Sequence, residues 1–170
     1  GDHRDLHSFP TLRSSDLRIL RAGGFQCCGF VSPAVFEGIN KTAIKVKWLE
    51  NDTEQLLMTP MTEESQLTIG RWQIHVDVFE WINRNLADLK ECKAFFCDEI
   101  GPLEVLHRKG WIKALDIVDE RKCELNVITF RPSLLDYFNQ RFPDMVVYNL
   151  DYQGDDDKAI RDVINLFGIE

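Results

Sequence analysis

The stretch that decides the fold is AFFCDEIGPLE, which runs from Ala94 to Glu104. Its first four residues are apolar, and the next two, Asp98 and Glu99, are carboxylates. A short run that is apolar on both faces is typical of a strand inside a parallel sheet covered by helices. Gly101-Pro102 then ends the strand with a turn. Because α/β sheets place their ligands at the carboxyl ends of strands, the residues after Cys97 are the first candidates for a site.

Strand and helix patterns alternate along the chain on both sides of this segment. A hairpin is predicted from the period-2 alternation at 44–48 and a second strand at 55–58. We therefore predict an α/β domain with a mostly parallel sheet, helices on both faces and an inserted β-hairpin. Further strands are expected at 25–31, 71–76, 125–130 and 145–150, and helices at 17–22, from 77, and at 108–120, 133–142 and 156–167.

Residues 7–17, HSFPTLRSSDL, show no periodicity and resemble the translation of a sequencing adapter. We therefore expect a non-native tail over residues 1–17 and a single, incomplete domain over 18–170. Asp155-Asp156-Asp157 resembles a metal cluster, but the end of a loop and the N-cap of the last helix explain it more simply.

The composition excludes several classes of protein. The chain has 20 Lys and Arg against 28 Asp and Glu, a net charge of −8, which argues against a non-specific nucleic-acid binder. No apolar run approaches the roughly 20 residues that a membrane-spanning helix needs. The five cysteines are an odd number without a C-x-x-C pair, which argues against a zinc or disulfide framework and fits a cytoplasmic protein.

Four apolar residues followed by Asp-Glu form the Walker B arrangement of nucleotide-hydrolysing enzymes. In that arrangement the first acid holds hydrated Mg²⁺, and the second positions or deprotonates a water molecule. Taken alone the pattern is weakly specific, since parallel strands often end in an acid where the loop meets solvent. It makes Asp98 a candidate metal ligand and Glu99 a candidate catalytic base.

The longer string DEIGPLE, with GFVSP at 29–33 and TFRPSLL at 129–135, resembles the small P-loop nucleoside-triphosphatase family first described from thermophiles. FEGINKT at 36–42 and IGRW at 69–72 are further matches in order. The resemblance implies a RecA-like fold and Mg²⁺-dependent hydrolysis of ATP, GTP and other nucleoside triphosphates.

The same resemblance implies roles for individual residues. Asp98 would bind the cofactor Mg²⁺, and Glu99 would be the general base or orient the water. Arg131 could reach the γ-phosphate, or instead pair with Asp98 or Glu104. Gly101 would belong to the cofactor-binding loop and shape the segment that holds Glu99.

One family motif is missing from these 170 residues, the P-loop G-x-x-x-x-G-K-[ST]. Gly24 and Gly29 have the required spacing, but Phe30-Val31 follow them in place of Lys-Ser/Thr. We therefore predict an N-terminally truncated nucleoside-triphosphatase that lacks its first strand and P-loop and binds nucleotide poorly. A nucleotide or nucleoside kinase and a non-catalytic interaction module with the same fold are the alternatives. The expected partner is a nucleoside triphosphate, with no membrane and no specific nucleic acid.

Overall fold

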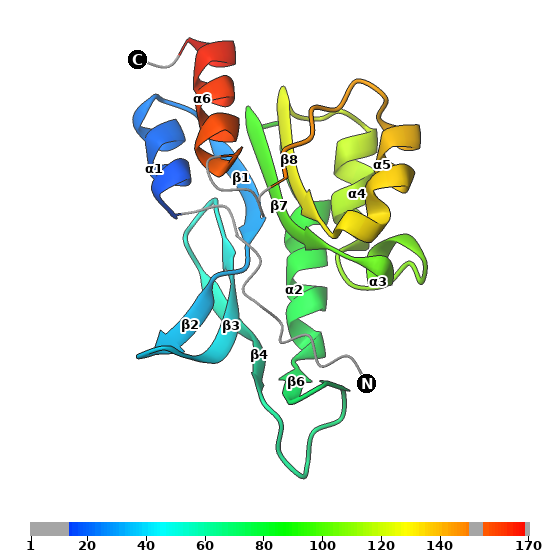
Figure 1. Ribbon diagram of the computed structural model, residues 1–170. Coiled ribbons are helices and arrows are strands. Elements are labelled where there is room, and N and C mark those ends of the chain that lie inside the picture. Colours follow the sequence, from blue (N-terminus) through cyan, green and yellow to red (C-terminus); the bar gives the residue numbers. More distant parts are fainter. Residues whose placement is uncertain (1–13, 150–154, 169–170) are drawn as a thin grey trace.

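The computed structural model describes residues 14–149 and 155–168, which form one eight-stranded sheet flanked by helices (Figure 1). The strand order is β5-β6-β4-β3-β1-β7-β8, with β2 paired to β3. The strands are β1 Cys27–Val31, β2 Ala34–Glu37, β3 Asn40–Trp48, β4 Glu54–Pro60, β5 Thr68–Ile69, β6 Trp72–Ile74, β7 Ala94–Ile100 and β8 Leu125–Phe130. The helices are α1 Ser14–Ala22, α2 Val76–Ala87, α3 Pro102–Val105, α4 Ile112–Asp119, α5 Leu135–Arg141 after a 3₁₀ turn at Pro132–Leu134, and α6 Asp155–Phe167.

The sheet is mixed, so the expectation of a mostly parallel sheet is wrong for the described residues. Only β1 with β7 and β7 with β8 run parallel, while the pairings among β1 to β6 are antiparallel. Short turns join β2 to β3 and β3 to β4, and such turns allow only antiparallel pairing. The predicted hairpin is present as β3 and β4, with Ile44 opposite Met58, and it belongs to a larger antiparallel extension of the sheet.

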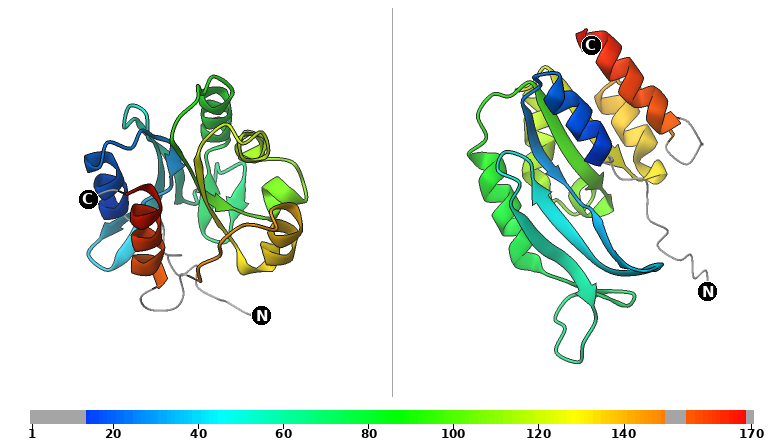
Figure 2. Two further views of the ribbon diagram at one scale, coloured as in Figure 1. Left: turned by 90° about the horizontal axis from the view of Figure 1, so that it is seen from above. Right: turned by 90° about the vertical axis from the view of Figure 1, so that its left-hand side faces the viewer.

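Helices cover both faces of the parallel strands, as predicted. α1 and α6 lie on one side of the sheet, and α2, α4 and α5 lie on the other (Figures 1 and 2). Alternate residues of β7 supply the two cores: Phe95 and Cys97 pack toward α2 and α4, whereas Ala94 and Phe96 pack toward α1. This alternation explains why the strand is apolar at every position up to Asp98.

Several element boundaries differ from the sequence predictions. Residues 145–149 form no strand, and residue 150 lies outside the described residues. The helix expected from Arg108 begins only at Ile112, because Arg108 and Gly110 both have positive φ and interrupt it. The helix at 155–167 is confirmed, but the side chains of 155–157 and residues 1–13 of the predicted tail are outside the described part.

Two further properties bear on the sequence predictions. Cys28 and Cys92 form a disulfide, so the expectation that excluded disulfides is wrong for this pair. Strands distant in sequence bring the two residues together, and a search for short cysteine spacings cannot detect that.

None of the helices in the described ranges is long and apolar enough to cross a membrane.

Candidate functional site

A bulge at the end of β7 positions the two predicted carboxylates. The register between β7 and β8 shifts between Cys97 and Ile100, so Asp98 and Glu99 lie where the ladder is interrupted. Glu99 has a φ of 60°, a left-handed conformation that is uncommon for residues other than glycine. Asp98 is fully buried, whereas the side chain of Glu99 is exposed. Bulges of this kind turn neighbouring side chains in different directions, and they are frequent beside active sites.

Hydrogen bonds from both neighbouring strands fix the carboxylate of Asp98. The N–H of Ser32, just after β1, donates to Oδ2 at 2.9 Å, and the hydroxyl of Thr129 on β8 donates to Oδ1 at 2.7 Å. Thr129 Oγ1 in turn accepts the N–H of Glu99 at 2.7 Å. One hydroxyl therefore connects the two consecutive acids, and the carboxyl ends of three strands converge on them.

Burial raises the pKa of both acids, and the charge of Asp98 adds to the shift of Glu99. Burial raises the pKa of Asp98, and its hydrogen bonds from Thr129 and Ser32 oppose that shift. The pKa of Glu99 is also raised, first because surrounding protein atoms remove part of its solvent and then because of the charge on Asp98. Lys41 and Arg131 lower the pKa of Glu99 and so partly balance these effects. Paired carboxyls with raised pKa values are typical of functional sites.

Glu104 holds the loop that follows the two acids. Its side chain is buried, accepts the N–H of Gly101 at 2.8 Å and accepts the N–H of Trp111 at 3.1 Å. Gly110 must be glycine here, because it has a φ of +67° and a Cβ would lie 2.1 Å from Glu104 Oε1. The N–H of Gly101 is therefore used within the loop, so Gly101 shapes the segment; a direct cofactor contact through it stays a prediction.

Two cationic side chains, Arg131 and Lys41, act electrostatically on Glu99. The sequence analysis predicted Arg131 as a site residue but not Lys41. Arg131 is exposed just after β8, and its charge lowers the pKa of both Glu99 and Glu104. Lys41 at the start of β3 interacts electrostatically with Glu99. Its own pKa is lowered, mainly by burial, with Arg71 acting in the same direction. Sequence reasoning also assigned no role to Thr129, although a hydroxyl near the end of the strand predicted at 125–130 was the available signal.

A cavity of about 880 Å³ opens beside these residues. Asp98, Glu99, Thr129 and Arg131 are among the residues that line it. The lining also includes β8, Leu20 of α1, Val163 of α6 and residues 145–147. β8 is the last strand of the sheet, and all six of its residues are half-buried. The volume lies within the range of small-molecule sites.

Comparison with known proteins identifies the family. The sequence model of the family described as NTPase matches residues 11–164. The chain belongs to this NTPase family. The predicted resemblance is thereby confirmed, whereas the roles of Asp98, Glu99, Gly101 and Arg131 stay predictions.

Individual proteins resemble the chain in sequence or in fold. The nucleoside-triphosphatase THEP1 of Sulfurisphaera tokodaii is 29% identical over 86 residues, which is 51% of this chain and 50% of that protein. The chain thus spans about half the length of this curated relative. The solution structure of a human cancer-related nucleoside triphosphatase has a TM-score of 0.65 at 16% identity and covers 90% of this chain and 87% of its own. The crystal structure of THEP1 from Aquifex aeolicus has a TM-score of 0.64 at 16% identity, with coverages of 92% and 93%. These two likenesses confirm the α/β NTPase fold.

Proposed function

We propose that this chain carries the hydrolytic carboxylates of a Mg²⁺-dependent nucleoside-triphosphatase, which converts ATP or GTP to the diphosphate and phosphate. The observation that carries the proposal is the bulge at the end of β7. There Thr129 connects a buried, fixed Asp98 to an exposed Glu99, and all three residues line the cavity. Because one acid is buried and fixed and the other is exposed, the two adjacent acids would have different tasks.

The oxygen atoms of Asp98 and its neighbours are of the kind that binds magnesium. Carboxylate and hydroxyl oxygens are the hard ligands that Mg²⁺ prefers, and Mg²⁺ usually keeps several waters. Asp98, with Ser32 and Thr129 fixing its two oxygens, would hold the hydrated ion. When bound, the ion would neutralise charge that develops on the phosphate oxygens.

The remaining residues would act on water and phosphate. Glu99 would orient the attacking water and accept its proton as the new O–P bond forms and the bond to the β-phosphate oxygen breaks. Its raised pKa makes it a stronger base than an ordinary glutamate. Arg131 and Lys41, whose charges act on Glu99, would also balance the charge of the phosphates.

The phosphate cradle would lie at the start of α1. α1 is followed by a short turn and then by β1. Its N-terminus therefore lies toward the carboxyl end of β1, where Ser32 contacts Asp98. A helix N-terminus favours phosphate binding. We propose that a strand and a G-x-x-x-x-G-K-[ST] loop placed before α1 would occupy the cavity beside β8, and that the 170-residue chain, whose sequence lacks that motif, binds nucleotide weakly.

Phosphate release from MgATP and MgGTP tests this function. The unaltered chain is compared with a chain in which a strand and G-x-x-x-x-G-K-[ST] loop replace residues 1–13. We expect Mg²⁺-dependent turnover in the loop-bearing chain and background turnover in the unaltered one. In the loop-bearing chain, Glu99→Gln should lower turnover by at least about 100-fold while nucleotide binding persists. Glu63→Gln, at an exposed residue of the β4–β5 loop, is the matched control.

Other outcomes would favour the alternatives. Unchanged turnover in Glu99→Gln would remove Glu99 from the mechanism. An increase of ADP release on adding a nucleoside or nucleotide acceptor would favour a kinase. Tight MgATP binding without hydrolysis in the loop-bearing chain would favour an interaction module.

A further inference from the structure

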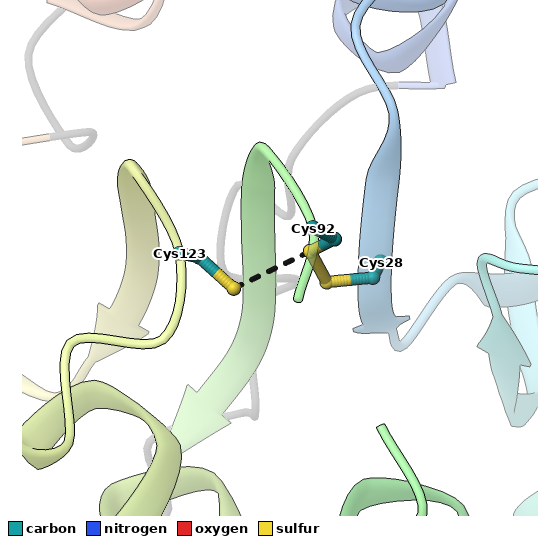
Figure 3. A group of neighbouring side chains, drawn as sticks. All are labelled: Cys28, Cys92 and Cys123. Atoms are coloured by element: carbon teal, nitrogen blue, oxygen red, sulfur yellow. Dashed lines mark hydrogen bonds between the residues drawn. A yellow bond between two sulfur atoms is a disulfide. The ribbon is translucent and has the colours of Figure 1, made fainter. Parts of the chain in front are cut away.

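Three cysteines meet at the end of the sheet opposite Asp98 and Glu99. Cys28 is the second residue of β1, Cys92 lies just before β7, and Cys123 lies just before β8. All three are buried, and their Sγ atoms lie within 4.8 Å of one another (Figure 3). Cys28 and Cys92 are joined in a disulfide, and Cys123 Sγ lies 3.3 Å from Cys92 Sγ. The parallel register that pairs Cys28 with Phe95 creates this convergence.

The cluster offers three sulfur ligands to a single metal ion. Thiolates bound to zinc lie about 2.3 Å from the ion, so two of them in a tetrahedral site are about 3.8 Å apart. The 3.3 Å between the Sγ atoms of Cys92 and Cys123 and the 4.8 Å within which all three Sγ atoms lie bracket that value. The Cα atoms of Cys28 and Cys92 are 6.4 Å apart. Side-chain rotation can therefore separate these two sulfurs without moving the strands.

We propose that, in the reduced chain, Cys28, Cys92 and Cys123 bind one thiophilic ion of the Zn²⁺ class, with water in the fourth position. Cys92 and Cys123 are 8% and 6% exposed, which gives the ion a route to solvent, whereas Cys28 is 1% exposed. Soft thiolates select zinc-like ions over Mg²⁺ or Ca²⁺. The bound ion would tie together the amino ends of three neighbouring strands, and binding energy of this kind adds to folding stability.

The disulfide and the ion exclude each other. Opening the disulfide takes two electrons and two protons and gives the thiols of Cys28 and Cys92. A dithiol supplies both and becomes a disulfide, whereas a phosphine supplies the electrons and becomes its oxide, with the protons and the oxygen coming from water. Binding of the ion then releases the protons of all three thiols. Burial and the neighbouring Glu91 raise the pKa of free Cys123. The positive charge of the ion opposes that effect, because a coordinated thiol is deprotonated outright.

A titration with Cd²⁺ and Zn²⁺ tests the site in the full chain. The chain is reduced with a phosphine and freed of reductant under nitrogen. Cd²⁺ binding is followed by the ultraviolet absorption of cadmium–thiolate bonds, and Zn²⁺ binding by competition with a chromophoric chelator. We expect one ion per chain, and at least a 100-fold loss of affinity in Cys28→Ala and in Cys123→Ala.

Cys27→Ala is the matched control. Cys27 is the chain neighbour of Cys28 and is also buried, but it packs in the other core, toward α1. This variant should bind the ion as the unaltered chain does. The oxidised, unaltered chain should bind none, and that comparison needs no variant to fold. Binding that survives disulfide formation or persists in Cys123→Ala would overturn the proposal, as would a reduced chain that binds no ion.

Discussion

Replacing Thr129 by valine isolates the hydroxyl that connects the two acids. Valine has nearly the same shape as threonine, so packing is preserved while the donor to Asp98 and the acceptor for the N–H of Glu99 are both lost. A hydrogen bond to a charged group contributes about 1.5–3 kcal/mol, and one between neutral groups about 0.5–1.5 kcal/mol. Allowing for the apolar gain of the added methyl group, the free energy of unfolding should fall by about 2–4 kcal/mol.

Urea unfolding followed by the fluorescence of the four tryptophans measures this change. In a thermal scan it corresponds to a lowering of Tm of about 5–15 °C for a domain of this size. Thr129→Ser is the control, since serine keeps the hydroxyl and should cost no more than about 1 kcal/mol. The reasoning is refuted if Thr129→Val unfolds within about 0.5 kcal/mol of the unaltered chain, or if serine costs as much as valine.

The remaining predictions concern charge and backbone. Because burial raises the pKa of Asp98 in the folded chain, its contribution to stability is present at low pH and is lost as the pH rises through that pKa. Asp98→Asn should therefore flatten the pH dependence of the free energy of unfolding, as measured by urea unfolding from pH 4 to pH 8; a pH dependence equal to that of the unaltered chain would contradict this. Gly110→Ala should cost about 1–3 kcal/mol more than Gly38→Ala in the same assay, since both glycines have positive φ but only Gly110 would place a Cβ against Glu104. Equal costs would show that the buried Glu104 can move aside.

The sequence predicted the parallel strands well because their signal is local. β8 has the predicted bounds, and β7 begins at the predicted Ala94. The extension of β7 to Ile100 was missed, because acids followed by Gly-Pro favour a turn and only pairing with β8 shows the bulge. The antiparallel extension was underestimated because β2 and β5 are short and weakly patterned, whereas β6 lies within the strand predicted at 71–76.

The site residues likewise divide into those with a local sequence signal and those without one. Asp98 and Glu99 could be found because a recognisable string contains them. Lys41 could not, because its interaction with Glu99 depends on the strand order, in which β1 separates β3 from β7. The cysteine cluster has no local signature either, since the register of three strands creates it.

The two ends of the parallel strands offer opposite coordination chemistry. At the carboxyl ends, Asp98 and Glu99 present oxygen, the donor that Mg²⁺ prefers; at the amino ends, Cys28, Cys92 and Cys123 present sulfur, which Mg²⁺ avoids and zinc-like ions select. Each proposed site can therefore be loaded without filling the other. A phosphatase activity that requires Mg²⁺ but is unchanged by zinc removal would separate the two. Loss of that activity when zinc is removed would instead indicate that the ion at the amino ends stabilises the three strands on which the acids are positioned.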